Sequence, residues 1–360
     1  PCDTAPVSSW PRHPSGCPVL PADASYGSDR SGLISGFLFR PGAAGSPLDT
    51  AGAARWLAGV GAEAKAGDGA FAWLHFNLAH AATERWLRDH LGEVDEFFDA
   101  LHEGSRSTRI EYAHAALIAV VNDVLYEFDF EPSQIATLWM WVDERTVVTA
   151  RLQPLRSIDR LRAAVKRGEI FGSSVALLTH LLRDQADVLV QIVRAATGRV
   201  DEVEDSLLAE RVTRSRTRLG ALRRVLVRLR RLLAPEPGAL FRLLNQPPGW
   251  VADEDVQELR HSTEEFSAVL ADMTALQERI KLLQEEIAAR VTEETNRSVY
   301  VLTMVTVLAL PINMIAGLLG MNVGGVPLAE HAKGFWIVVA IIASFTAAAG
   351  WWAFRRGGDD

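Results

Sequence analysis

Polar side chains recur at helical spacing in and beside a long uncharged stretch near the C-terminal end of the chain. No charged residue or histidine occurs from Ser298 to Ala329. Hydroxyl and carboxamide oxygens on one helical face can hold the water shell of a cation, and apolar side chains between them can gate by dewetting. The positions that share such a face are Asn296, Val299, Thr303, Thr306, Leu310 and Asn313.

The same polar positions also have a purely structural interpretation. Thr and Asn in an apolar helix commonly hydrogen-bond to neighbouring helices. Of these residues, Asn313 is the one for which exposure to lipid is least favourable, so we expect it to face a polar pore.

Two apolar segments must position these residues. The segments 298–320 and 334–354 contain no Asp, Glu, Lys, Arg or His, and the first is long enough as a helix to cross a hydrocarbon core of ~30 Å. Aromatic residues flank the second segment, as is typical of membrane interfaces. We predict two transmembrane helices; the alternative is a buried helical hairpin in a soluble protein.

The positive-inside rule predicts the orientation of these segments. Arg290 and Arg297 precede the first segment, and Arg355 and Arg356 follow the second, whereas Lys333 in the loop 321–333 is offset by Glu330. We therefore expect a multi-pass protein of the plasma (inner) membrane, with both termini, including the short tail 355–360, in the cytoplasm. Residues 1–30 lack the apolar core of a signal peptide.

Composition excludes several classes of protein. Of 360 residues, 48% are hydrophobic and 23% are charged, with a formal net charge of −8. These values exclude a chain that is disordered or embedded in membrane throughout, and they do not favour a general nucleic-acid binder. No nucleophile elbow, Walker A or Rossmann motif occurs, so we predict no enzyme activity, no catalytic residue and no covalently bound cofactor.

The rest of the chain is predicted to form a mixed domain followed by helices. We expect a disordered tail at 1–32 and an α/β domain at 33–165, because strand-like runs alternate there with amphipathic segments. The strand-like runs are 33–40, 72–78, 108–128 and 136–151, and the helical segments between them are 82–91 and 94–103. Residues 166–252 are predicted to form cytoplasmic helices.

A stalk helix is predicted at 253–297 and continues into the first apolar segment. Acidic residues at its start suit a helix N-terminus. Its apolar positions alternate three and four residues apart, a seam that we expect to require partner helices, most simply from a homo-oligomer. These positions are Phe266, Val269, Met273, Leu276, Ile280, Leu283 and Ile287.

An arginine-rich run at 211–231 has two interpretations. It can form a nucleic-acid or phosphate patch, or one exposed face of an amphipathic helix. Val225, Leu226 and Leu229 keep helical spacing among the arginines, and no aromatic residue interleaves them. We therefore favour the helix face and predict no nucleic-acid partner.

The end of the first apolar segment carries the motif Gly320-Met321-Asn322, followed by Val323 to Leu328. A cytoplasmic α/β domain, a stalk helix that enters the first span, this terminal motif and a short loop to a second span resemble the CorA-type metal-ion transporter superfamily. The residues after the motif look like its zinc-transporting, ZntB-like branch. The resemblance covers the chain from about residue 33 to its C-terminal end.

The resemblance implies a funnel-shaped homopentamer whose first spans line one central pore. Gly320, Met321 and Asn322 would then form the selectivity ring, in which Asn322 holds a hydrated cation. The stripe from Asn296 to Asn313 would line the pore, and Glu330 and His331 in the loop would attract cations. The implied cargo is Zn²⁺, with proton-coupled uptake known in the branch. A magnesium or cobalt channel and a non-transporting membrane-anchored sensor or adaptor are the alternatives.

Overall fold

The computed structural model describes residues 27–59, 69–91, 95–103, 108–113, 115–126, 128–131, 133–208, 212–320 and 332–356. The chain divides into two compact units. The first comprises Pro1–Val203 and Thr217–Glu278, and the second comprises Glu204–Arg216 and Arg279–Asp360.

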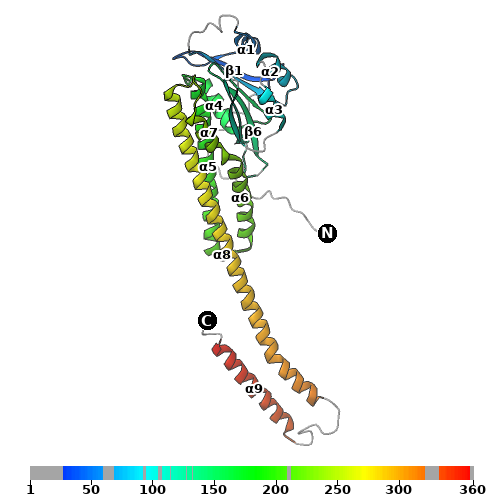
Figure 1. Ribbon diagram of the computed structural model, residues 1–360. Helices are drawn as coiled ribbons and strands as arrows, with labels where there is room; N and C mark the ends of the chain where they lie inside the picture. The colour runs from blue at the N-terminus through cyan, green and yellow to red at the C-terminus, as the bar shows by residue number, and fades with distance from the viewer. Residues whose placement is uncertain are drawn as a thin grey trace. The chain divides into compact units, whose positions relative to one another are not determined.

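A seven-stranded mixed sheet forms the centre of the first unit (Figure 1). Its strand order is β2-β1-β3-β7-β6-β5-β4, and of these neighbouring pairs β3 and β7 run parallel while the others run antiparallel. The strands are β1 (Leu33–Phe39), β2 (Ser46–Pro47), β3 (Phe71–Asn77), β4 (Arg109–Ala113), β5 (Ala116–Val124), β6 (Ile135–Val142) and β7 (Thr146–Arg151).

Helices cover both faces of this sheet, because successive side chains of each strand point to opposite faces. In β3, Trp73 packs into the core with α4 (Arg156–Lys166), α5 (Ser174–Leu208) and α7 (Pro235–Asn245). Leu74, the next residue, packs into the other core, with α1 (Thr50–Leu57), α2 (Thr83–Leu91) and α3 (Asp95–Glu103). The predicted α/β domain is therefore a three-layer structure.

Two hairpins account for the longer strand-like runs. The run 108–128 was expected as one strand, but β4 and β5 pair antiparallel, with Ala115 between them at φ 60. The run 136–151 likewise forms two paired strands, β6 and β7. Its turn is held by the Asp143 Oδ1, which accepts from the backbone N–H groups of Arg145 at 2.7 Å and Thr146 at 2.6 Å.

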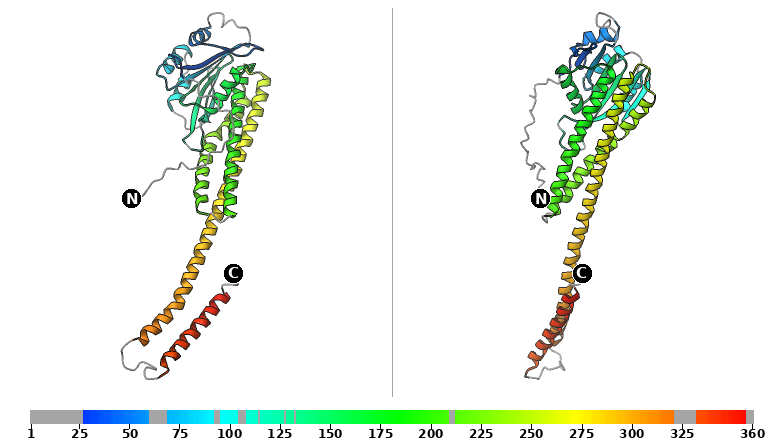
Figure 2. Two further views of the ribbon diagram at one scale, coloured as in Figure 1. Left: turned by 180° about the vertical axis from the view of Figure 1, so that it is seen from behind. Right: turned by 90° about the vertical axis from the view of Figure 1, so that its left-hand side faces the viewer.

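Helices α5, α6 (Val212–Leu233) and the first part of α8 (Asp253–Leu319) lie side by side in the first unit (Figures 1 and 2). The start of α8 at Asp253 agrees with the prediction. In the second unit the guanidinium of Arg279 on α8 pairs with the Glu204 carboxylate at the end of α5. Helix α9 (Gly334–Arg356) follows the loop after α8.

The seam of α8 is buried within a single chain. Phe266 is 1% exposed, Met273 is 0% exposed, and Ile280 and Ile287 are equally covered. The expectation that this seam requires helices from another copy is therefore wrong. For Phe266 and Met273, which lie in the first unit, the physical reason is that α5 and α6 carry apolar faces of their own, among them the buried Leu189, Ile192, Leu226 and Leu229.

The arginine-rich run forms an amphipathic helix where the structure describes it. In α6, Val225, Leu226, Leu229 and Leu232 are buried, whereas the arginines from Arg216 to Arg231 are exposed. The predicted helix face is thus confirmed for this part of the run.

Candidate functional site

The C-terminal half of α8 exposes the stripe that the sequence predicted. Asn296, Thr303, Leu310 and Asn313 are all exposed, and Val299 is 56% exposed. Their alternating spacing of three and four residues continues to Gly317 and Gly320. In this part of α8 the half-buried residues Met304, Leu308, Pro311 and Ile315 recur at the same spacing on another face of the helix. The stripe therefore lies on a different face from these partly covered positions.

The threonines of the stripe are bonded to their own helix rather than to a neighbouring one. The Oγ1 of Thr303 donates to the carbonyl of Val299 at 2.8 Å, and that of Thr306 donates to the carbonyl of Leu302 at 2.8 Å. Each hydroxyl has used its single proton, and its remaining lone pairs can accept from water. The stripe can therefore hold the hydration water of a cation.

Two backbone features shape the end of α8. Pro311 lies inside the helix and has no N–H, so it cannot bond to the carbonyl of Val307. Gly320 donates to the carbonyl of Ala316 at 2.9 Å, and a Cβ at Gly320 would lie 3.1 Å from that oxygen. A side chain there would crowd the last turn, which favours glycine at this position.

The other predicted residues of the motif and loop lie outside the described residues. They are Met321, Asn322, Glu330 and His331. Of the predicted selectivity ring, the structure places Gly320 alone.

One described helix is long and apolar enough to cross a membrane, and it contains this stripe. The described apolar part of α9, Gly334–Ala348, is shorter than the ~20 residues that a span requires. The second span therefore remains a prediction. Large apolar side chains around α8, such as Leu302 at 67% exposed and Val305 at 59%, suit contact with lipid or with other copies.

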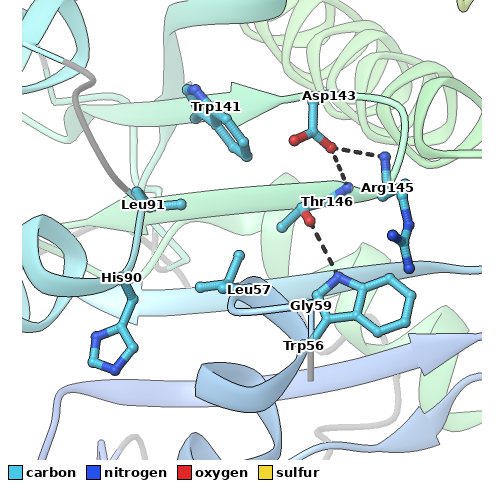
Figure 3. Close-up of a pocket in the computed structure, with 9 residues that line it drawn as sticks. All are labelled: Trp56, Leu57, Gly59, His90, Leu91, Trp141, Asp143, Arg145 and Thr146. Carbon is cyan, nitrogen blue, oxygen red and sulfur yellow. Dashed lines mark hydrogen bonds between the residues drawn. The ribbon is translucent and has the colours of Figure 1, made fainter. Parts of the chain in front are cut away.

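A cavity of about 230 Å³ lies in the first unit, beside the β6–β7 turn (Figure 3). The Trp56 indole donates to Thr146 Oγ1 at 3.2 Å, and the Arg145 guanidinium lies 4.7 Å from the centroid of the Trp56 ring. Burial raises the pKa of Asp143, although the two backbone hydrogen bonds in the turn oppose this effect. These groups stabilise the turn. The positive charge of the Arg145 guanidinium disfavours a metal ion in the cavity.

The buried histidine of the domain, His75, has structural partners. His75 is buried, its Nδ1 lies 2.8 Å from Thr149 Oγ1, and its Nε2 accepts from the Arg151 Nε at 3.0 Å. Burial lowers the pKa of His75 well below its usual range, and Arg151 and Arg162 act in the same direction. No group of three His, Cys, Asp or Glu side chains arranged for a metal occurs among the described residues. The sequence did not single out the buried carboxyls Asp123 and Glu236, which come from separate segments.

Comparison with known proteins agrees with this architecture. Residues 68–356 match the family described as CorA-like Mg²⁺ transporter protein. The chain is 31% identical over 289 residues to the "Divalent cation transporter CmaX" of Pseudomonas aeruginosa, covering 79% of this chain and 86% of that protein. It is 24% identical over 283 residues to the "Zinc transport protein ZntB" of Pectobacterium atrosepticum, with the same coverage of both chains.

Solved structures give the same result for the fold. The full-length CmaX protein superposes with a TM-score of 0.75 at 27% identity, covering 91% of this chain and 98% of that one. The CorA magnesium transporter from Methanocaldococcus jannaschii shares the fold, with a TM-score of 0.70 at 19% identity and coverage of 88% and 96%. These relatives are transporters, in agreement with the expectation that the chain is not an enzyme. The chain therefore belongs to the CorA-like Mg²⁺ transporter family.

Proposed function

We propose that this protein transports divalent metal cations across a membrane, with Zn²⁺ as the principal cargo. The observation that carries this proposal is the exposed stripe from Asn296 to Gly320, on a face of α8 that its own chain leaves uncovered. When several copies turn this face toward a common axis, the stripe lines a pore.

The chemistry of the stripe favours a cation that keeps its water shell. Oxygen acceptors alternate with apolar side chains, and the stripe contains no carboxylate, imidazole or thiolate that would bind zinc directly. Removing the first water shell from a hard divalent cation is costly, whereas hydrogen bonds to that shell are not. Gly320, Met321 and Asn322 would form the selectivity ring at the outer end, with Glu330 and His331 attracting cations in the loop.

This function needs a homo-oligomer. We propose a pentamer, as the resemblance to the CorA-type superfamily implies. The proposal includes two spans, both termini in the cytoplasm and contact of α9 with lipid. Native mass spectrometry of the full chain in detergent tests the copy number. A monomer in both detergent and lipid would exclude a shared pore.

The names of the relatives indicate different cargoes. The 31% identical relative is named for divalent cations in general, and zinc is named for a relative at 24%. A magnesium or cobalt channel is therefore the competing function. Since neither apolar segment contains Asp, Glu, Lys, Arg or His, a proton-coupling group of these types would have to lie outside them.

Flux into proteoliposomes tests the function. We expect labelled Zn²⁺ to enter faster than Mg²⁺, Co²⁺ or Ni²⁺, and Asn322→Ala to lose most of this flux. Faster entry of Mg²⁺ than of Zn²⁺ would favour the competing channel. The absence of any flux with correctly inserted protein would favour a sensor or adaptor. Unchanged flux in Asn322→Ala would remove this residue from the mechanism.

A further inference from the structure

A cluster of polar side chains is buried in the first unit where the sheet meets three helices. Asn122 and Asp123 lie on β5, Ser157 on α4, Gln185 on α5 and Glu236 on α7. Each is 5% exposed or less. The cluster contains two carboxyls and belongs to none of the sites described above.

Asp123 is fully engaged by hydrogen-bond donors. Its carboxylate accepts from the backbone N–H of Val124 at 2.7 Å, and from the N–H and Oγ of Ser157, both at 2.9 Å. These bonds join the end of β5 to the start of α4. Burial nevertheless raises the pKa of Asp123 to about 6, and Asp159 on α4 contributes by repulsion. Asp159 itself pairs with Arg162 at 3.4 Å.

Glu236 has much weaker support. It is 0% exposed in the first turn of α7. The Nε2 of Gln185 lies 3.4 Å from its Oε2 but makes a shorter bond, 2.7 Å, to the carbonyl of Asn122. Its Oε1 has no hydrogen-bond partner among the described residues.

The charges around Glu236 disfavour its ionised form. Of the groups that face it, Gln185 on α5 is neutral, and Asp123 on β5 repels a second negative charge. Burial is the largest effect and raises the pKa of Glu236 well above its usual range. A protonated carboxyl can remain at this position, whereas an ionised one favours movement toward water.

We propose that Asp123 and Glu236 form a proton-dependent latch that holds the start of α7 against the sheet. With a proton on Glu236, α7 stays packed on β4. When both carboxyls are ionised, their repulsion and the cost of burying two charges favour detachment of α7. Because α7 joins α6 to α8 in the chain, such a change would reach the start of α8, and through it the transport that we propose above.

The direction of the pH effect follows from the raised pKa values. Both carboxyls are easier to protonate in the folded chain than in the unfolded one, so they stabilise the fold fully only at low pH. This stabilisation is lost as the pH rises through their folded-state pKa values. The latch is therefore closed in acid and loosened in alkali.

Hydrogen exchange of the full chain in detergent micelles tests the latch. We expect protection of the amides of Ala239 to Leu244, corrected for intrinsic exchange, to fall at least about tenfold between about pH 5.5 and 8.5. Glu236→Gln should remove most of this dependence, because a neutral amide of the same shape cannot ionise and only Asp123 still titrates. Asp143→Asn, which alters a carboxyl in the β6–β7 turn, should keep the wild-type response. A flat wild-type profile, or a Glu236→Gln profile that falls like the wild type, would overturn the proposal.

A measurement on the wild type guards against a variant that does not fold. Infrared spectroscopy in heavy water should detect the C=O stretch of a protonated carboxyl at neutral pH, and its absence would overturn the latch. Zinc flux measured against cytoplasmic pH separates the two proposals. A pH response of α7 without any metal flux would contradict the proposed function and leave the latch supported.

Discussion

Two parts of α8 use the same spacing for opposite purposes. From Phe266 to Ile287, positions three and four residues apart are buried, and the chain itself supplies the covering surfaces. From Asn296 to Gly320, positions with this spacing are exposed. The first seam is uniformly apolar, whereas the second stripe mixes amide, hydroxyl, apolar and glycine positions. Spacing thus identifies a helix face, but the residue types on it determine whether the fold can bury that face within one chain.

The largest difference between these parts should appear in stability. Phe266→Ala removes a ring that is 1% exposed, and we expect the free energy of unfolding to fall by about 3–5 kcal/mol. Leu302→Ala, at a position 67% exposed, should change it by less than about 0.5 kcal/mol. Chemical unfolding in detergent, followed by circular dichroism, measures both. Equal losses would mean that the two faces of α8 do not differ as described.

Chemical labelling in lipid should separate the stripe from the rest of the exposed surface. After Cys2 and Cys17 are replaced by serine, single cysteines at Asn296, Thr303 or Leu310 should react quickly with a water-soluble thiol reagent. Cysteines at Val301 or Val305 should react slowly, because lipid or helix contacts cover them. Equal labelling rates for the cysteines on and off the stripe would mean that the stripe does not line a water-filled pore.

Replacing a polar residue of the stripe should reduce transport more than replacing its neighbour. We expect Asn313→Ala to lower zinc flux several-fold, up to about tenfold or 1.4 kcal/mol, because one level of carboxamide oxygens is lost. Met314→Ala is the matched control, since Met314 is also exposed but lies off the stripe. If the control loses as much flux as Asn313→Ala, the stripe is not the pathway.

The smallest effect should come from surface charges between the two parts. Arg290 and Glu286 form an exposed ion pair at 2.7 Å. Exposed pairs contribute little, so Arg290→Ala should change the unfolding free energy by less than about 0.5 kcal/mol. Ile287→Ala in the same turn should cost about 2–5 kcal/mol, because Ile287 is 1% exposed. Thermal unfolding of the two variants side by side provides the comparison.

Much of the fold could be predicted from local patterns, and the exceptions have clear causes. Acidic residues at Asp253 to Asp255 marked the start of α8, and a strand-like run marked β6 and β7. The bend at Ala115 was missed, because the residues on both sides of it include no glycine or proline. The burial of Phe266 was expected, but the covering surface was not, since it depends on how α5 and α6 fold back.

The candidate site was predictable to a different extent. Helical spacing was sufficient to place Asn296 to Asn313 on one exposed face. The partners of Thr303 and Thr306 depend on side-chain rotamers, which sequence alone does not give. The pair Asp123 and Glu236 was beyond local patterns, because residues more than a hundred positions apart meet only in the tertiary structure. A carboxylate near the end of the apolar β5 and a glutamate between two prolines were the available signals.

The bonds of Thr303 and Thr306 to their own helix have a consequence for ion discrimination. Both hydroxyl protons are committed to backbone carbonyls, so these side chains turn electron-rich oxygen outward. A conduit bounded by such oxygens would repel chloride and phosphate while attracting positive ions, although it bears no formal negative charge. The preference for divalent over monovalent ions and the preference for cations over anions would then have separate origins. The preference for cations would come from the hydroxyl groups of Thr303 and Thr306.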